Sequence, residues 1–277
     1  MKSVVGYLGP MLYALLFGIG CILYFIDLRL PTTFLSSIHY YISYVLATCC
    51  VVSYCVTSNL DCGVIKPSNV ELQYKYPRQE VLYPRNTICL ECNLVRIPRS
   101  KHCKSCNVCV ARFSHHCFWF NKCIGQDNYK YFIIFLFLHV ITCAYAIFVI
   151  TGLMMAQVEN SQDAMKQLRH EFLARKNRGL LVVASVSFVA VPLVGSFLLF
   201  HLYLILTNVT AYEWYKRGIL LEDLQRRRPV LDNSWGGVMG STKVDIITVD
   251  GINYNPYNLN AWENVKDALF QRKFKQG

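Results

Sequence analysis

Charged side chains are scarce in this sequence. They make up 16% of its 277 residues, whereas 54% are hydrophobic, and the mean hydropathy is positive. Such a composition is far from that of a soluble domain and favours a small membrane protein with polar parts. Acidic residues are fewer than basic ones, and the formal net charge is +11. In a membrane chain, a basic excess more often follows a cytosolic membrane face than a nucleic acid.

The sequence also lacks the cysteine distribution of a secreted disulfide scaffold. Seven of its 13 cysteines fall between Cys89 and Cys123, interleaved with three histidines. Mixed clusters of cysteine and histidine at short spacings are typical of zinc sites, and zinc needs reduced thiols. We therefore expect this segment to face the cytosol. No internal repeat or low-complexity tract is evident.

Four charge-free apolar runs predict membrane spans. They cover about Val4–Ile26, Phe34–Val56, the stretch between Lys130 and Glu159, and the stretch between Arg178 and Glu213. Each run is long enough to cross roughly 30 Å of hydrocarbon as a helix. The first run follows a single lysine and is long for a signal peptide, so a retained span is the favoured interpretation.

Four spans put both termini on one side of the membrane. Of the 28 lysines and arginines, 22 lie in the termini and the central loop, and six lie in the other two connections. The positive-inside rule therefore places the termini and the loop in the cytosol. The expected fold is an all-α integral membrane protein, with four transmembrane helices and a cytosolic zinc-binding cysteine-rich domain between helices 2 and 3. The expected parts are residues 1–60 (helices 1 and 2), 61–128 (zinc domain), 129–212 (helices 3 and 4) and 213–277 (C-terminal tail).

The loop holds more candidate metal ligands than two zinc sites need. They are Cys89, Cys92, His102, Cys103, Cys106, Cys109, His115, His116, Cys117 and Cys123. Two closed tetrahedral zinc sites take eight ligands, which leaves two side chains over. A spare cysteine beside a spare histidine is the pair that nucleophilic catalysis requires. A purely structural zinc domain explains the same count, and spacing alone does not distinguish His115 from His116.

This spacing resembles the cysteine-rich domain of the DHHC family of protein S-acyltransferases, named for an Asp-His-His-Cys motif. The matching pattern is Cys-x2-Cys-x9-His-Cys-x2-Cys-x2-Cys-x4-Ser-His-His-Cys-x5-Cys-x4-Asn-x3-Phe, from Cys89 to Phe132. The tail segments "TAYE" (Thr210 to Glu213) and "NPYNLNAWENVKDALF", which contains Asn264, are similar to two further family motifs. The resemblance covers nearly the whole chain, and the phrase "IPRSKHC" resembles most closely a branch that includes a yeast enzyme.

The resemblance implies a role for each ligand. One structural zinc ion would be held by Cys89, Cys92, His102 and Cys109, and the other by Cys103, Cys106, His116 and Cys123. His115 and Cys117 are then the reacting pair of a protein-cysteine S-palmitoyltransferase. Cys117 would take a long-chain acyl group, palmitoyl above all, from acyl-CoA and pass it to another protein. The implied partners are acyl-CoA, the lipid bilayer and membrane-associated substrate proteins with cytosolic cysteines, and no nucleic acid.

Two groups of side chains could serve this chemistry. Aromatic residues of the first and third spans are candidates to line a cavity for the acyl chain, namely Tyr13, Phe17, Tyr24, Phe135 and Tyr145. Basic residues near the loop could meet the CoA phosphates or anionic lipid, namely Arg99, Lys101, Lys104 and Lys122. In the tail, Asn260 and Glu263 predict the start of a short helix. The final "KFKQG" resembles a dilysine retrieval signal, which favours the endoplasmic reticulum or Golgi.

Two positions depart from the family pattern. Ser114 stands where the family has aspartate, and Ala211 stands where it has a second threonine. A serine brings no charge to stabilise an imidazolium, but a cysteine nucleophile depends less on its base, so we expect reduced activity. The alternative is a catalytically silent membrane scaffold that binds partners through its zinc domain. We also hypothesise that Ser114 and Ala211 belong to one contact network.

Overall fold

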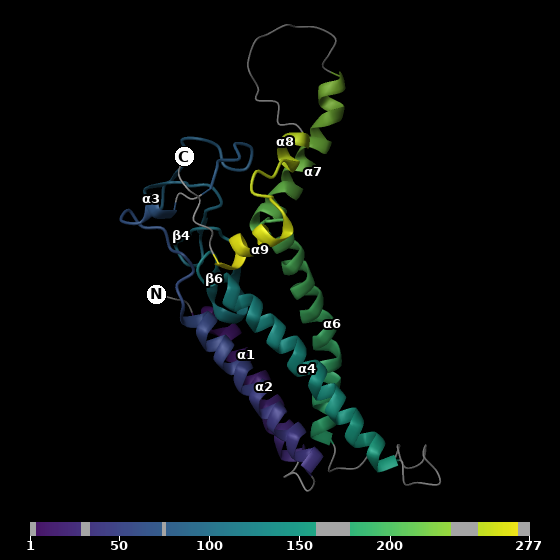
Figure 1. The fold of residues 1–277 in the computed structure, drawn as a ribbon. Coiled ribbons are helices and arrows are strands. Elements are labelled where there is room, and N and C mark those ends of the chain that lie inside the picture. The colour runs from purple at the N-terminus through teal and green to yellow at the C-terminus, as the bar shows by residue number, and fades with distance from the viewer. Residues whose placement is uncertain (1–3, 29–33, 74–75, 159–177, 234–248, 271–277) are drawn as a thin grey trace. The chain divides into compact units, whose positions relative to one another are not determined.

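The structure is a computed structural model that describes residues 4–28, 34–73, 76–158, 178–233 and 249–270 (Figure 1). The chain divides into two compact units. Unit 1 consists of Met1–Leu60, Cys117–Asn121 and Tyr131–His201, and unit 2 consists of Asp61–His116, Lys122–Lys130 and Leu202–Gly277. Unit 1 holds most of the apolar helical sequence, and unit 2 holds most of the cysteine-rich segment and the tail. The predicted domain boundaries stay a prediction.

The long helices are α1 (Leu8–Leu28), α2 (Phe34–Asn59), α4 (Tyr129–Val158) and α6 (Arg178–Leu206), with a 3-10 turn η1 (Val4–Tyr7) before α1. Among the described residues, these four helices are long and apolar enough to cross a membrane. The prediction of four spans, with the cysteine-rich segment between the second and third, is therefore confirmed. The fourth helix stops earlier than its apolar run, because Asn208 adopts a left-handed backbone with φ of 49°.

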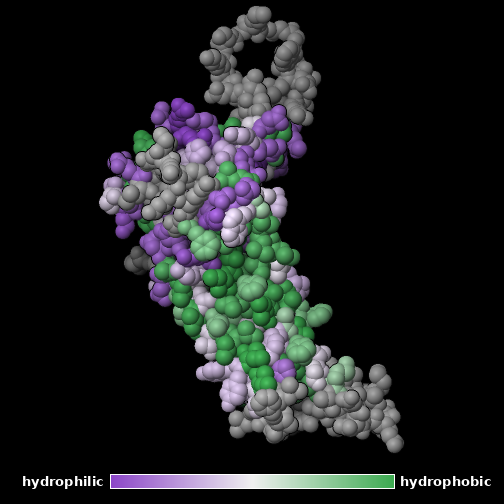
Figure 2. Space-filling model, viewed as in Figure 1, coloured by the Kyte–Doolittle hydropathy of each residue, from purple (hydrophilic) through white to green (hydrophobic). Residues whose placement is uncertain are grey.

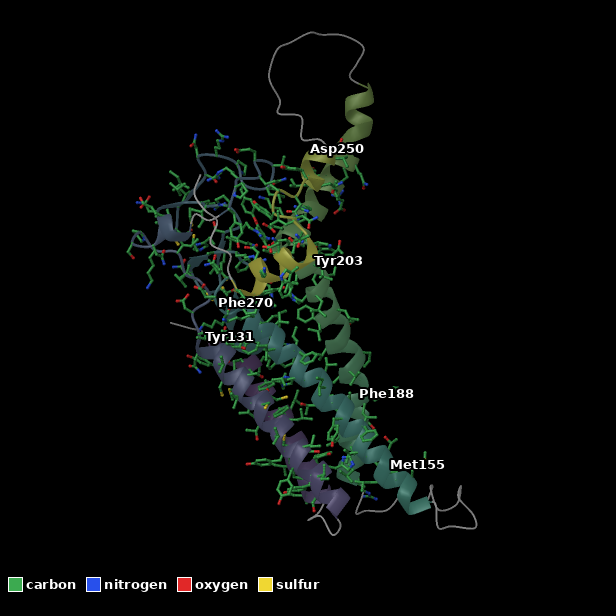
Figure 3. All side chains as sticks on the ribbon, in the orientation of Figure 1. Tyr131, Met155, Phe188, Tyr203, Asp250 and Phe270 are labelled. Atoms are coloured by element: carbon green, nitrogen blue, oxygen red, sulfur yellow. The ribbon has the colours of Figure 1, made fainter. Side chains whose placement is uncertain are left out.

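The interior of unit 1 is built from the facing sides of these helices. Its buried cluster joins α1, α4 and α6 through Tyr24, Ala146, Ile150, Met154 and Leu180. Hydrogen bonds connect α2 to its neighbours, since Tyr24 Oη lies 2.9 Å from Ser43 Oγ and His39 Nδ1 lies 2.7 Å from Tyr145 Oη. Outward side chains are apolar too, as at Phe188 on α6 (Figure 3) and over the green surface of Figure 2. Such an exterior suits lipid rather than water.

The cysteine-rich segment folds into three short hairpins. They are β1 (Ile88–Cys89) with β2 (Leu94–Val95), β3 (Lys101–Cys103) with β4 (Val108–Val110), and β5 (His115–Cys117) with β6 (Lys122–Ile124). The short helices are α3 (Val70–Gln73) before the hairpins and η2 (Phe118–Phe120) within the third. A single two-stranded hairpin is marginally stable in water, so these pieces need further cross-links to hold their shape.

The three hairpins repeat with one period. Their first strands end at Cys89, Cys103 and Cys117, which are 14 residues apart, and their turns contain Asn93, Asn107 and Asn121. All three asparagines are left-handed, with φ of 51°, 55° and 46°. Asparagine tolerates this conformation better than most residues. The expectation that the sequence contains no internal repeat is therefore wrong. The repeat is hard to see in the sequence because its period is short and only a few positions are shared by the three copies.

The tail of unit 2 adds α7 (Ala211–Asn233), α8 (Val249–Asn253) and α9 (Ala261–Phe270). Thr210 and Glu213 form a capping box at the start of α7, since Thr210 N donates to Glu213 Oε2 at 2.8 Å and Glu213 N donates to Thr210 Oγ1 at 3.1 Å. At α9, Glu263 N donates to Asn260 Oδ1 at 2.9 Å, which confirms the predicted helix start. The terminal lysines of the predicted retrieval signal lie outside the described residues.

Candidate functional site

The structure gathers eight of the ten candidate ligands into two groups. Cys89, Cys92, His102 and Cys109 form one group, and Cys103, Cys106, His116 and Cys123 form the other. Within each group the ligand atoms all lie within 4.8 Å of one another. Each group takes a Cys-x-x-Cys pair from one hairpin and a histidine and a cysteine from the next. His116 joins a group and His115 does not, a distinction that the spacing left open.

The spacing of the atoms in each group fits a tetrahedral zinc ion. In the first group, His102 Nδ1 lies 3.3 Å from Cys92 Sγ and 3.8 Å from Cys109 Sγ. In the second, His116 Nδ1 lies 3.6, 3.3 and 3.9 Å from the sulfurs of Cys103, Cys106 and Cys123. Zinc bond lengths in a tetrahedron predict sulfur-to-nitrogen separations of about 3.6 Å. Three thiolates and one imidazole are also a common donor set for structural zinc, so both groups could bind it.

Cys117 occupies the corresponding position of the third hairpin but belongs to neither group. Its place matches Cys89 and Cys103, the first cysteines of the two Cys-x-x-Cys pairs. Three residues later, where those pairs have their second cysteine, the third hairpin has Phe120. Cys117 therefore lies in the same kind of turn as the cysteines of the metal groups, but its hairpin lacks the second cysteine of a Cys-x-x-Cys pair.

The turn directs backbone donors at the Cys117 sulfur. Burial raises the pKa of the Cys117 thiol, and backbone N–H groups of Trp119 and Phe120 act in the opposite direction. The sulfurs of Cys89 and Cys103 receive the same two donors, from residues two and three places further on. Because an N–H that donates to sulfur favours the thiolate, the third hairpin offers a thiolate cradle of the kind that surrounds metal-bound sulfur.

Ser114 and His115 precede this thiol in the chain, and His115 is the first residue of β5. Ser114 Oγ lies 3.1 Å from His115 Nδ1, so the hydroxyl can orient the ring. Burial, together with neighbouring His116, lowers the pKa of His115 to about 4. A neutral imidazole can accept a proton. Within β5, His115 and Cys117 are two positions apart, and alternate residues of a strand project to the same face.

Unit 1 contains a large apolar cavity, and Cys117 is part of its wall. The cavity has a volume of about 880 Å³ and is lined by side chains of α1, α2, α4 and α6 together with Cys117, Trp119 and Phe120. The five aromatic residues proposed for an acyl cavity, Tyr13, Phe17, Tyr24, Phe135 and Tyr145, all line it. The side chains that surround the thiol are thus those of a hydrophobic chamber between membrane-spanning helices.

Two features that the sequence did not indicate hold the Cys117 segment against these helices. Tyr54 Oη donates to the Trp119 carbonyl at 3.0 Å, and the Tyr54 ring stacks on those of Tyr13 and Phe120 at 4.0 and 5.0 Å. Gly9 of α1 lies so close to η2 that a Cβ there would collide with the Phe118 carbonyl oxygen. A glycine near the start of a helix marks close backbone approach, but the sequence cannot identify its neighbour.

Arg99 is fully buried in unit 2, which excludes it from the proposed CoA contacts. Its guanidinium donates to both carboxylate oxygens of Glu213 at 2.9 Å and to Asn208, and lies over the rings of Tyr76 and Tyr257. Burial alone would raise the pKa of Glu213, but Arg99 holds it below its usual value. The Thr-x-x-Glu spacing of a capping box could have pointed to Glu213, whereas nothing in the sequence pairs it with Arg99.

The comparison with protein families agrees with this geometry. Residues 83–218 match the family model described as DHHC palmitoyltransferase. The chain therefore contains a DHHC domain. No curated protein matches the chain. The DHHC domain contains both cysteine–histidine groups, Cys117 and the Thr210–Glu213 cap, and the branch within the family stays a prediction.

Proposed function

We propose that this DHHC protein is an S-acyltransferase that carries a long-chain acyl group on Cys117. The observation that supports it best is the position of the Cys117 thiol in the wall of the apolar cavity of unit 1. Each methylene buried there is worth roughly 0.8 kcal/mol, so a palmitoyl tail of acyl-CoA gains more than a short chain does. The cavity volume lies within the range of about 300–1,000 Å³ that is usual for ligand sites.

The transfer takes two steps, in which one thioester replaces another. His115 accepts the thiol proton, and the Cys117 thiolate attacks the acyl-CoA thioester carbonyl. The bond from that carbonyl to the CoA sulfur breaks, and the CoA thiolate takes the proton from His115. His115 then accepts the proton of a substrate cysteine, whose thiolate attacks the acyl-enzyme carbonyl. The bond from that carbonyl to the Cys117 sulfur breaks, and the Cys117 thiolate takes this proton back from His115. Splitting the transfer in this way is ordinary covalent catalysis.

The residues around Cys117 and His115 orient the imidazole, stabilise the thiolate or hold the hairpins in place. Ser114 orients His115, and the N–H groups of Trp119 and Phe120 stabilise the Cys117 thiolate whenever it forms. The eight ligands Cys89, Cys92, His102, Cys109, Cys103, Cys106, His116 and Cys123 would hold two zinc ions. Bound zinc would cross-link the hairpins and take no part in the bond changes, since a zinc-bound thiolate is a weaker nucleophile.

The proposed setting follows from the substrates. Acyl-CoA and membrane-associated proteins with cytosolic cysteines would reach Cys117 from the cytosolic side, with both termini on that side. The excess of lysine and arginine in the central loop and tail supports this orientation. The endoplasmic reticulum or Golgi remains the proposed compartment.

Autoacylation tests the proposal directly. Purified full-length protein is incubated with a clickable palmitoyl-CoA, and label is compared among the wild type, Cys117→Ser and Cys55→Ser. Cys55 is an exposed cysteine of α2 and serves as the matched control. We expect label on the wild type and on Cys55→Ser, and at least a tenfold loss in Cys117→Ser. The labelled site is then located by mass spectrometry.

Two results would contradict the proposal. Label that persists in Cys117→Ser would remove the assigned nucleophile. No label on a folded wild type, with label appearing in Ser114→Asp, would mean that the natural chain is a silent scaffold.

A further inference from the structure

The four helices that line the cavity of unit 1 do not enclose it equally. Among the residues that the structure describes, the lining side chains of α2 and α4 are all buried or half-buried. The lining residues that are exposed and belong to helices come instead from α1 and α6, and the five large aliphatic ones are 47–68% exposed, namely Leu16, Ile19, Val182, Val186 and Leu193. The cavity therefore has a closed wall on α2 and α4.

The exposed lining residues mark a slot between α1 and α6. Facing the cavity does not by itself expose a side chain, because Phe135 and Leu136 of α4 line it and are only 8% and 4% exposed. A lining residue that is half exposed or more therefore also belongs to the outer surface, as the edge of an opening does. We use the name slot for the opening bounded by Leu16 and Ile19 on α1 and by Val182, Val186 and Leu193 on α6.

The two ends of the slot are set by contacts of α1. At one end, Tyr24 of α1 and Leu180 of α6 belong to the same buried cluster, so the two helices meet there. At the other end, Gly9 of α1 lies against the Phe118 carbonyl in the turn that follows Cys117. The slot thus runs along the helices, from the Cys117 turn towards the cluster around Tyr24.

The slot opens towards hydrocarbon. Its five edge residues are aliphatic, and the helices that carry them are long and apolar enough to cross a membrane. Neighbouring outward side chains of α6 are apolar as well, as at Phe188 (Figure 3) and Val189. A long acyl chain loses free energy with every methylene that is moved from lipid into water, so a path through lipid is preferred to one through the cytosol.

We infer that the slot is the passage through which a long acyl chain moves sideways between the bilayer and the cavity. A chain whose polar head stays at the membrane surface enters or leaves by this passage without being drawn through water, and no bond changes in the movement. The chain of acyl-CoA enters this way, and the chain of the acylated product leaves this way. The identity of the chain rests on the proposed function, whereas the passage itself does not.

A phosphatidylcholine that carries a diazirine in one acyl chain tests the passage without turnover. The headgroup and the second chain hold this lipid in the bilayer, so its diazirine reaches the inside of the cavity only sideways. Full-length protein in nanodiscs that contain the lipid is irradiated, and the labelled residues are located by mass spectrometry. We expect label at Leu136, inside the cavity, as well as at Phe137, which is 53% exposed and does not line the cavity.

Two valines of α6 provide a matched pair of variants. Val186 lines the cavity and is 64% exposed, whereas Val189 does not line it and is 63% exposed. Val186→Trp fills the slot, so we expect at least a fivefold loss of label at Leu136, with the label at Phe137 retained. The initial rate of autoacylation with clickable palmitoyl-CoA should fall at least threefold in the same variant. Val189→Trp should match the wild type in all three measurements.

A second pair on α1 keeps the test decisive if Val186→Trp folds poorly. Ile19→Trp narrows the slot from the other side, and Ile22→Trp is its control, because Ile22 is exposed but does not line the cavity. No label at Leu136 in the wild type, or equal label there in a slot variant and its control, would overturn the inference. Loss of that label with an unchanged autoacylation rate would also overturn it, because acyl-CoA would then enter elsewhere. A wild type that is labelled at Leu136 but is not acylated would support the passage and contradict the proposed function.

Discussion

Arg99 and Glu213 form an ion pair whose side chains are both 0% exposed. The guanidinium also reaches Asn208, which receives Arg112 and donates to Asp267, so the pair is part of a buried network rather than an isolated contact. Removing one partner of such a pair leaves the other charge buried and uncompensated. The pair therefore makes unit 2 sensitive to single substitutions far from any reacting atom.

We predict that Glu213→Gln destabilises the protein by about 3–5 kcal/mol, the usual cost of breaking a buried pair. The denaturation midpoint in urea measures it. The matched control is Arg85→Gln, which breaks the exposed pair between Arg85 and Glu80 and should cost at most about 1 kcal/mol. Equal midpoints for the two variants would show that Arg99 is satisfied without the carboxylate.

The lowered pKa of Glu213 gives the same pair a pH dependence. A carboxyl group whose pKa is lower in the folded state adds stability above its unfolded pKa, and this stability is lost as pH falls through the folded pKa. The stability difference between the wild type and Glu213→Gln should therefore be full at neutral pH and shrink in acid, below about pH 4. Comparing two proteins with the same metal ligands cancels the protonation of those ligands.

At the scale of single residues, sequence could identify types but not partners. It indicated which side chains suit zinc, and it left His115 and His116 equivalent, because both lie beside cysteines at ligand spacing. The structure distinguishes them, because adjacent residues of strand β5 project to opposite faces and only His116 joins a ligand group. Arg99 was expected near the surface as one of several basic residues. A single sequence contains no signal that pairs it with a glutamate 114 positions further on.

Among the elements, α1 and η2 depend on one glycine. Gly9 lets the α1 backbone reach the turn that follows Cys117, whereas a Cβ built on Gly18 of the same helix meets nothing within 4 Å. Intrinsic helix propensity favours alanine over glycine by about 1 kcal/mol at either position. The two substitutions therefore share the same effect on the helix and differ in their effect on the turn.

We predict that Gly9→Ala lowers the autoacylation rate at least tenfold, because η2 must move and displaces the Cys117 thiol. Gly18→Ala should label as fast as the wild type and melt at the same temperature or slightly higher. Initial rates with clickable palmitoyl-CoA provide the measurement. Equal rates for both variants would mean that the thiol position does not depend on this contact.

The helices and hairpins were predictable to different degrees. Long charge-free runs predicted all four spans, because lipid imposes apolarity on every face of such a helix. The apolar run did not show where between Arg178 and Glu213 the fourth helix ends, because Asn208 at the turn accepts hydrogen bonds from Arg99 and Arg112 that no local pattern reveals. The hairpins of unit 2 escaped prediction for a related reason. Their strands are two or three residues long, and metal ligands rather than alternating hydrophobicity define them.

At the scale of the whole molecule, the two units depend on different forces. Unit 1 has an apolar exterior and a large apolar cavity, so lipid is its natural solvent. Unit 2 contains two-stranded hairpins, which are marginally stable by themselves. Zinc bound at the two cysteine–histidine groups would therefore contribute folding free energy.

We predict that purified protein contains two zinc ions per chain, and that His102→Ala contains at most one. Cys62→Ser is the matched control, because Cys62 is buried in the same apolar cluster as Cys123 but belongs to neither ligand group. Elemental analysis of the purified variants measures the ratio. Two zinc ions in His102→Ala, or fewer than two in Cys62→Ser, would contradict the assignment of ligands.

The 14-residue period of the hairpins fixes how many metal groups they can form, which is one fewer than the number of hairpins. Each metal group takes a cysteine pair from one hairpin and a histidine and cysteine from the next, so three hairpins close two groups. A cysteine at the end of the first strand of the last hairpin has no following hairpin to supply the histidine and cysteine of a further metal group. In this chain that position is Cys117, so the thiol to which we assign the acyl transfer is the one that the row of hairpins leaves without a metal group.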